Sequence, residues 1–168
     1  MPSFAEYNIC PATHDVPSDV ELESLLRRVY VGEGFISEEL AIESLAAKAV
    51  RNRGELLVAV KDDERKVVGT VILVTPGSPS QRLAGSDREA EVHLLAVLPE
   101  FRRHGVGRKL IAKALERARA QGFESVVLWT QASMLAAHRL YMALGFTRFP
   151  ERDFQNHRRE FLVMRAEL

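Results

Sequence analysis

Residues 102–109, with the sequence RRHGVGRK, combine basic side chains with glycines and are suited to binding an anion. The basic residues are Arg102, Arg103, Arg108 and Lys109, and the glycines are Gly105 and Gly107. The segment joins an apolar run to a helical pattern, so the first N–H groups of the helix lack partners and lie at the positive end of its dipole. Glycine has no Cβ, so a ligand approaches the backbone closely. The segment is therefore predicted to cradle a phosphate, although the glycines could also serve only to turn the chain.

Two common phosphate-binding motifs do not fit this segment. A Walker loop needs Gly-Lys followed by Ser or Thr, whereas Lys109 follows Arg108 and precedes Leu110. The dinucleotide fingerprint needs a third glycine where Leu110 stands. Neither motif explains the glycine spacing.

The composition bounds the class of protein. A length of 168 residues is typical of one domain, and residues 1–168 are expected to form a single domain. The 23 acidic and 23 basic residues balance, so no overall field favours binding to nucleic acid or to an anionic membrane. Cys10 is the only cysteine, which excludes an internal disulfide and a multi-cysteine metal site. The N-terminus lacks the pattern of a secretory signal and no segment approaches the ~20 apolar residues that span a bilayer, so a soluble, cytoplasmic protein is expected.

The elements that must position this segment follow from hydrophobic periodicity. Strands are expected at 4–10, in a hairpin at 55–75, and at 90–98, 124–130, 146–149 and 158–168. Helices are expected after a capping box of Ser18 and Glu21, from Ser37, between Gly105 and Gly122, and before Gly145. The Gly-, Pro- and Ser-rich segment 75–89 is expected to be a loop. This order predicts an α/β domain with a mixed sheet flanked by helices.

The strand at 90–98 carries ionisable residues between apolar ones. Regular alternation puts one set of side chains on one face of the strand: Glu91, His93, Leu95 and Val97. The opposite face would carry Val92, Leu94, Ala96 and Leu98. Both faces are largely apolar, which predicts a central strand covered on both sides.

Two motifs together resemble the GCN5-related N-acetyltransferases, the GNAT superfamily. Arg102, Gly105 and Gly107 match the pattern Arg/Gln-x-x-Gly-x-Gly/Ala of its pyrophosphate loop, and LAVLPEFR resembles the preceding Val-x-Pro-x-x-Arg. The segment AAHRLYMALGF, residues 136–146, is similar to the second signature A-x-x-L-Y-x-x-x-G-F. Both motifs occur in the expected order, so the resemblance covers most of the chain.

The resemblance implies a mostly antiparallel sheet with a splay between the fourth and fifth strands, and acetyl-CoA as the acyl donor, with no metal. Backbone groups of Leu95, Ala96 and Val97 would bind the pantetheine arm in that splay. The residues that would wrap the pyrophosphate are Arg102, Arg103, His104, Gly105, Val106, Gly107, Arg108 and Lys109. Arg103 stands where the family often has glycine and is expected to disfavour a positive φ.

The resemblance also assigns the acid–base groups. Tyr141 occupies the position of the general acid, and a phenol has a pKa close enough to that of a thiol to protonate the leaving sulfur. Glu91 lies at the offset where histone-modifying members carry a glutamate base, and His93 is the alternative base or a partner of Glu91. Met134 stands where many members carry an asparagine that binds CoA, which weakens the expected contacts from that helix.

The acceptor site in the family is usually built from the first two helices and the last strands. Here Tyr30, Glu33, Phe35 and Phe154 are candidates for binding the acceptor, with Glu38, Glu39, Glu151 and Asp153 as further acids that attract a cation. The expected activity is transfer of an acetyl group from acetyl-CoA to a primary amine of a small molecule or peptide. The alternatives are a non-catalytic module that senses acyl-CoA, or an interaction domain without cofactor. A homodimer is possible, and the identity of the amine is not predicted.

Overall fold

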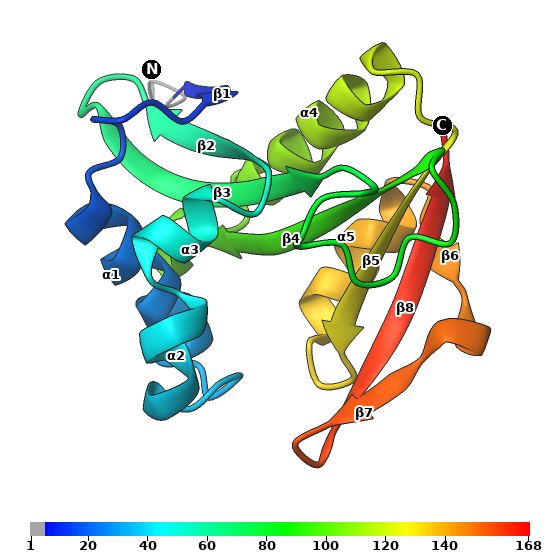
Figure 1. The fold of residues 1–168 in the computed structure, drawn as a ribbon. Coiled ribbons are helices and arrows are strands. Elements are labelled where there is room, and N and C mark those ends of the chain that lie inside the picture. The colour runs from blue at the N-terminus through cyan, green and yellow to red at the C-terminus, as the bar shows by residue number, and fades with distance from the viewer. Residues whose placement is uncertain (1–5) are drawn as a thin grey trace.

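The computed structural model describes residues 6–168 and has the expected α/β architecture (Figure 1). In chain order the elements are β1 (Tyr7–Pro11), α1 (Asp19–Tyr30), α2 (Glu38–Ser44), α3 (Ala47–Arg51), β2 (Glu55–Lys61), β3 (Lys66–Val74), β4 (Glu89–Val97), the 3₁₀ turn η1 (Pro99–Phe101), α4 (Val106–Ala120), β5 (Ser125–Gln131), α5 (Leu135–Ala143), β6 (Thr147–Arg148), the 3₁₀ turn η2 (Pro150–Arg152), β7 (Phe154–Asn156) and β8 (Arg159–Glu167). The predicted fold class is confirmed. The predicted first strand began at Phe4, which lies outside the described residues.

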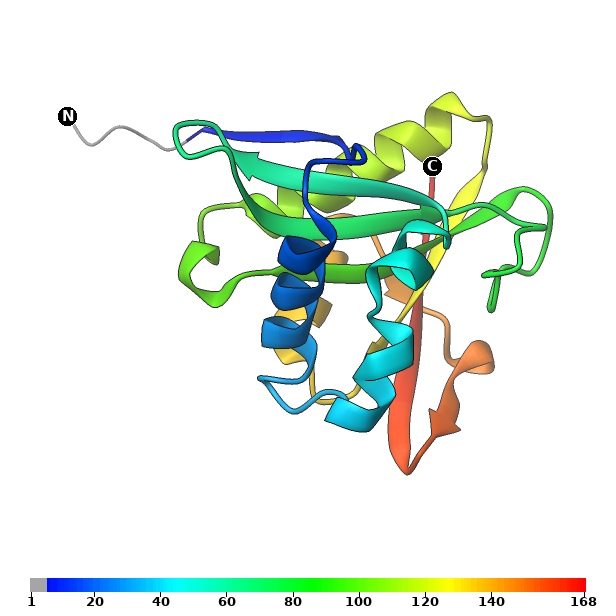
Figure 2. The same ribbon diagram turned by 60° about the vertical axis from the view of Figure 1, so that its left-hand side comes forward.

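The strands form a single eight-stranded sheet in the order β1-β2-β3-β4-β5-β8-β6, with β7 also paired to β8. Neighbouring strands are antiparallel, with the exception of the parallel pair β4 and β5. Helices cover both faces: α1, α2 and α3 lie on the near side in Figure 2, and α4 lies on the far side. Each layer buries its own apolar core, one centred on Leu110 of α4 and the other on Leu26 of α1.

The splay predicted between the fourth and fifth strands is confirmed. β4 and β5 pair over only three positions, from Glu89 opposite Ser125 to Glu91 opposite Val127. Beyond that point β5 is held by β8 as far as Gln131, while β4 stays with β3 as far as Val97. The edge of β4 toward β5 is therefore left without a partner strand from Val92 onward.

The alternation predicted for β4 is wrong in its second half because the strand is bulged. Thr70 of β3 lies opposite Ala96 and Ile72 lies opposite His93, so two residues of β4, Leu94 and Leu95, face one residue of β3. Leu94 has φ of 48°, as expected where an extra residue bends a strand. Val92 packs into the core on the α4 side, Leu94 and Ala96 pack on the α1–α3 side, and Leu95 and Val97 return to the α4 side. Glu91 and His93 consequently do not share a face with Leu95 and Val97.

The hydrogen bonds at the helix starts agree only in part with the caps predicted from the sequence. Ser18 accepts the predicted hydrogen bond from the N–H of Glu21, at 3.2 Å. The carboxylate of Glu21, however, accepts from the N–H of Val67 in β3 rather than closing a capping box. The helix α3 was not predicted, because its first N–H, that of Ala47, is bound by Glu23 of α1 instead of by a neighbouring cap residue.

Candidate active site

The predicted anion loop leads from η1 into α4 and has the backbone that a cradle requires. Gly105 precedes the first helical residue with φ of 77°, and as a glycine it offers no side chain to cap the helix. A Cβ on Gly107 would lie 3.1 Å from Cδ2 of Leu140, so glycine lets α4 approach α5 closely. The first N–H groups of α4 are therefore available to a ligand.

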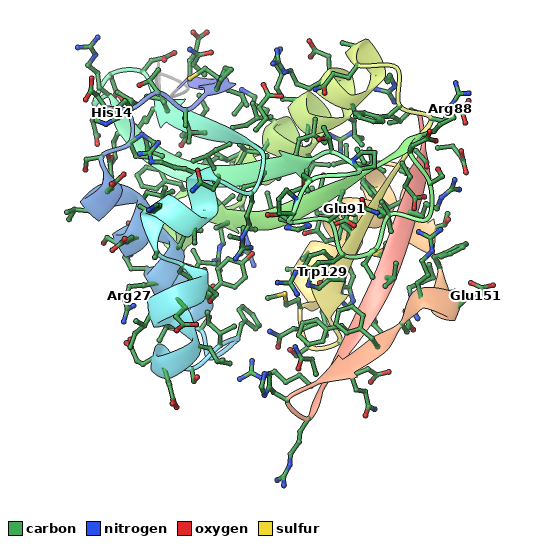
Figure 3. The ribbon with its side chains drawn as sticks, in the orientation of Figure 1. His14, Arg27, Arg88, Glu91, Trp129 and Glu151 are labelled. Carbon is green, nitrogen blue, oxygen red and sulfur yellow. The ribbon has the colours of Figure 1, made fainter. Side chains whose placement is uncertain are left out.

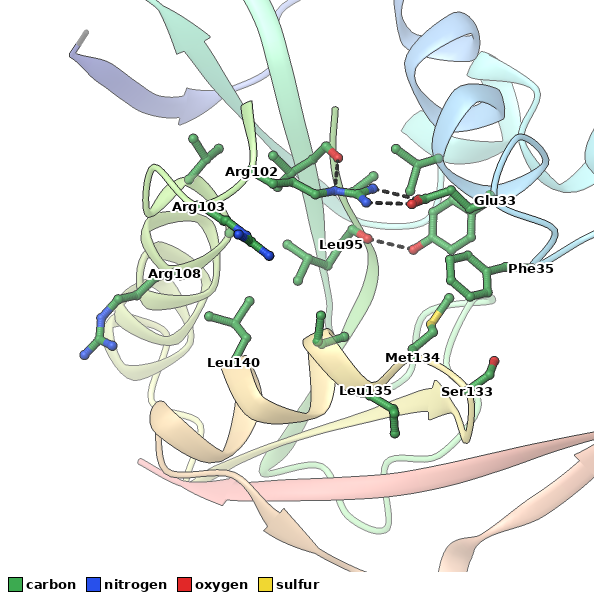
Figure 4. A pocket seen from close by; sticks show the side chains of 18 of the residues that line it. Glu33, Phe35, Leu95, Arg102, Arg103, Arg108, Ser133, Met134, Leu135 and Leu140 are labelled. Atoms are coloured by element: carbon green, nitrogen blue, oxygen red, sulfur yellow. Dashed lines mark hydrogen bonds and ion pairs between the residues drawn. The ribbon is translucent and has the colours of Figure 1, made fainter. Parts of the chain in front are cut away.

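Arg103 differs from expectation. It has φ of 63°, in the left-handed region that the sequence was predicted to avoid at this position. Such a conformation is unfavourable for a residue with a Cβ and is found mainly where the surrounding loop enforces it. The loop thus takes the positive-φ form usual for glycine while keeping an additional cation, which extends over the cavity in Figure 4.

A cavity of about 680 Å³ occupies the splay. Its walls are the free edge of β4, the anion loop, the α1–α2 link and the start of α5 (Figure 4). Most of the residues predicted to bind the acyl donor line it: Leu95, Ala96, Val97, Arg102, Arg103, Gly105, Val106, Gly107 and Arg108. His104 and Lys109 lie outside the lining. Met134, which stands where many members of the family carry a CoA-binding asparagine, lies within it.

Two carbonyl groups on the free edge of β4 are engaged by side chains that reach across the cavity. The hydroxyl of Tyr30 donates to the carbonyl of Leu95 at 2.8 Å, and Nε of Arg102 donates to the carbonyl of Val97 at 3.0 Å. The guanidinium of Arg102 also forms a bidentate ion pair with Glu33: Nη1 donates to Oε1 at 2.6 Å and Nη2 donates to Oε2 at 2.7 Å (Figure 4). The α1–α2 link is thereby tied both to β4 and to the anion loop.

Tyr141, the predicted general acid, lies on the buried side of α5. It is 6 % exposed, packs at 5.8 Å between ring centroids against Phe146, and does not belong to the lining of the cavity. Burial raises the pKa of its hydroxyl above the usual value, which keeps the phenol protonated. The pKa of Tyr30 is raised by its own burial and further by Tyr141, as expected for hydroxyls that lie near one another.

Glu91 is fully buried and bound by a turn of backbone. Its Oε1 accepts hydrogen bonds from the N–H groups of Arg82, at 2.8 Å, Leu83 and Ala84, at 2.6 Å. Burial alone would raise the pKa of this carboxyl, but the bond to His93 and the three N–H groups outweigh it and lower the pKa. Glu91 therefore holds the end of the loop 75–88 in place and is a weak proton acceptor.

His93 is bound to Glu91 through one ring nitrogen only. Nε2 lies 2.7 Å from Oε2 of Glu91, and because a carboxylate only accepts, Nε2 carries the proton and Nδ1 of the neutral ring is an acceptor. Within residues 6–168, Nδ1 has no hydrogen-bond partner although it is buried. Burial lowers the pKa of His93, partly offset by Glu91, and the charges of Arg53 and Arg82 lower it further. The His93 ring lies edge-on to Trp129, with 4.5 Å between the ring centroids.

The residues predicted to bind the acceptor fall into two groups. Tyr30, Glu33 and Phe35 line the main cavity, whereas Phe154 lies outside it on β7. Phe154 stacks on Phe161 at 5.0 Å and contacts Trp129 edge-on, so it belongs to an aromatic wall on the same face of the sheet as His93.

A smaller cavity of about 310 Å³ adjoins the first, since Ser133 lines both. It lies between Gly34 and the ends of β5 and β8, with Gln131, Ala132, Arg159 and Glu160 in its lining. Gln131 is 7 % exposed, donates to the carbonyl of Phe35 at 2.7 Å and accepts from Arg159 at 3.1 Å. This amide thus links the α1–α2 loop to the last strands.

The model of the Acetyltransferase (GNAT) family matches residues 20–146, which contain the splay, the anion loop and the helix of Tyr141. The chain belongs to this family. Curated GNAT relatives include human N-acetyltransferase 8B, 37% identical over 87 residues, and mycothiol acetyltransferase from Thermobispora bispora, 42% identical over 59 residues. These alignments cover 52% and 35% of the chain, but only 37% and 20% of the relatives' own length.

Solved structures agree on the fold of the GNAT chain. An acetyltransferase from Streptococcus agalactiae superposes with a TM-score of 0.74 at 19% identity, covering 96% of this chain and 98% of the other. A GNAT family acetyltransferase from Elizabethkingia anophelis with acetyl-CoA bound gives 0.66 at 19% identity, covering 96% and 98%. At these identities the similarity establishes the architecture alone.

Several residues of the site escaped the sequence analysis. Gln131 and Arg159 lie in segments predicted as strands or their ends, but nothing local marks their side chains as facing a cavity. Glu89 carries no motif either, yet it is 2 % exposed and bound by Arg152 and Arg165. The pairing of β5 with β8 brings Gln131 and Arg159 together, and that pairing is not visible in local spacing.

The part of the chain that the structure describes lacks two other kinds of feature, a membrane-spanning helix and a metal-binding cluster. None of the helices within residues 6–168 is both long and apolar enough to cross a membrane. The same part of the chain holds no group of three or more His, Cys, Asp or Glu side chains placed to bind a metal ion.

Proposed function

We propose that the protein transfers the acetyl group of acetyl-CoA to a primary amine of a small molecule or peptide. The observation that carries this proposal is the cavity in the splay, in which the free edge of β4 meets a basic loop at the start of α4. An extended polar arm suits an unpaired strand edge, and a pyrophosphate suits open N–H groups at a helix start with arginines around them. The similarity to N-acetyltransferase 8B and to mycothiol acetyltransferase supports the same reaction class.

The proposed chemistry is a direct transfer. The neutral amine attacks the thioester carbonyl carbon, a C–N bond forms, the C–S bond breaks, and one proton leaves the nitrogen while one reaches the thiolate. His93 is the proposed base, acting through water because it lies outside the lining of the cavity, and Glu91 positions its ring. Tyr141 is the proposed acid, since burial keeps its hydroxyl protonated, and because it too lies outside the lining its proton would reach the sulfur through water.

The Tyr141→Phe variant tests this assignment. It keeps the ring that packs on Phe146 and removes only the proton donor, so kcat for thiol release should fall by about 10²- to 10⁴-fold with little change in KM for acetyl-CoA. The measurement is thiol release from acetyl-CoA against a pool of primary amines. Unchanged kcat would remove Tyr141 from the proposed role.

A non-catalytic acyl-CoA sensor is the other outcome of the same assay. It is favoured by one observation: the carbonyl groups of Leu95 and Val97 are already bonded to Tyr30 and Arg102. CoA binding in calorimetry without thiol release from any amine would establish it in place of the transferase.

A further inference from the structure

The acidic residues expected to attract a cationic acceptor are largely neutralised within the chain. Glu33 is paired with Arg102, Glu38 with Arg27, and Asp153 with Arg148. Glu39 and Glu151 are exposed and line neither cavity. The acceptor side therefore presents few free negative charges.

Three arginines among the described residues on this side also lack a carboxylate partner. Within residues 6–168, Arg53, Arg82 and Arg159 form no ion pair with a carboxylate. Arg82 belongs to the turn bound by Glu91, and Arg53 is held under α2 by the carbonyl of Ser44, at 2.8 Å. Unpaired guanidinium groups beside a cavity favour an anionic ligand.

Arg159 is the member of this set that reaches a cavity. It lines the smaller cavity, and the buried amide of Gln131 holds one of its nitrogens, leaving its other donors free for a ligand. The neighbouring Glu160 also borders this cavity, but its side chain is exposed, whereas that of Arg159 is half-buried and held by Gln131.

The surface between Arg159 and His93 is aromatic. Phe161 shares the face of Arg159 on β8, and it stacks on Phe154, which in turn contacts Trp129 beside His93. Trp129 is half-buried and lies between the helices α1–α3 and strand β8 in Figure 3. An acceptor that extends from His93 to Arg159 would contact the proposed base at one end, the aromatic rings in the middle and the guanidinium of Arg159 at the other end.

We infer that the acceptor amine carries a carboxylate and an apolar side chain, and that Arg159 in the smaller cavity binds this carboxylate. The inference rests on the proposed function, since it names the class of substrate for the same site. The carboxylate would accept from Arg159 in a charge-assisted hydrogen bond, while the amine points back toward His93.

The test compares L-phenylalanine with phenethylamine, which differ only by the carboxylate. In the unmodified protein, kcat/KM for phenylalanine should exceed that for phenethylamine by about 10- to 100-fold, the range expected for a hydrogen bond to a charged group. Arg159→Gln should remove this preference by raising KM for phenylalanine and leaving phenethylamine unchanged. Arg158→Gln, which removes the same charge from the exposed neighbouring residue, should leave the preference intact.

A binding measurement separates this inference from the proposed function. Calorimetry with the CoA-saturated protein compares N-acetylphenylalanine with N-acetylphenethylamine and needs no turnover. If no amine of the pool releases thiol, the transferase assignment fails. The inference is then decided by binding alone: the acid should bind more tightly than the uncharged compound and lose that advantage in Arg159→Gln. Equal binding of the two compounds, or a preference that survives Arg159→Gln, would overturn it.

Discussion

At the scale of single residues, the structure distinguishes two groups, the expected base Glu91 and its alternative His93. Glu91 and His93 lie two apart on β4, and both were candidates for the base. Three backbone N–H groups saturate one oxygen of Glu91, and the other faces His93, whereas Nδ1 of His93 has no partner within residues 6–168. The sequence supplies the residue types and their spacing, but the turn 82–84 that binds Glu91 is recognisable only in the folded chain.

The pH dependence of kcat checks the role of His93. Burial, with the charges of Arg53 and Arg82, lowers the pKa of His93 below that of an ordinary imidazole, about 6.5, so the ring is neutral and able to accept a proton at neutral pH. Activity should therefore fall on the acid side through an apparent pKa below about 6.5, and His93→Gln should lower kcat by about 10²- to 10⁴-fold and abolish that limb.

The matched control for this experiment is Glu91→Gln. The amide retains an oxygen for the backbone donors but no longer carries the charge that raises the pKa of His93. The acid limb should move to lower pH in this variant rather than disappear. A limb that is unaltered in both variants would assign the titration to another group.

At the scale of elements, periodicity predicted the order of strands and helices but not the irregularities that make the site. The bulge at Leu94 and Leu95 turns the second half of β4 over, and no residue type in AEVHLLAVL marks it. The splay itself follows from the family resemblance, and the structure shows its cause: β5 leaves β4 after Val127 and continues along β8. The short β7 was missed because three residues give no usable period.

The link between the α1–α2 segment and the anion loop predicts an effect on CoA affinity. Glu33 occupies both terminal nitrogens of Arg102, so a pyrophosphate that binds Arg102 competes with this carboxylate. Glu33→Gln should tighten CoA binding by about 2- to 5-fold at low salt, the scale of a partly exposed ion pair, and the gain should shrink as salt is added. Calorimetric titration with CoA measures both.

Glu100→Gln is the corresponding control. Glu100 likewise forms a bidentate ion pair, with Arg28, in which each hydrogen bond is 2.9 Å long. Neither residue lines the cavity. Its CoA affinity should equal that of the unmodified protein. Weaker binding in Glu33→Gln alone would mean that Glu33 instead holds Arg102 in its ligand-binding position.

At the scale of the whole molecule, one buried carboxylate joins segments far apart in the sequence. Glu89 at the start of β4 accepts from Gly85 at 2.9 Å, Ser125 at 3.1 Å and Arg165 at 2.6 Å, and is also paired with Arg152. The loop 75–88, the parallel pair β4 and β5, the turn η2 and the strand β8 therefore meet at a single side chain. This junction fixes the base of the splay, below the point where β4 and β5 separate.

Stability at acid pH measures what this junction contributes. Burial would raise the pKa of Glu89, but the bonds from Arg152, Gly85 and Arg165 prevail and lower it from 4.5 to about 2. Since the pKa is depressed in the folded state, the stabilisation is complete above the unfolded value near 4.3 and is lost as the pH falls toward 2. The free energy of unfolding, measured with urea between pH 2 and pH 7, should be lower for Glu89→Gln than for the unmodified protein at neutral pH. Between about pH 4.3 and pH 2 the variant should lose less of this free energy, because it has no Glu89 carboxyl to titrate. Curves that remain parallel across the window would show that Glu89 is not the group responsible. A variant at Glu124, whose ion pair with Arg88 is exposed, should follow the unmodified protein.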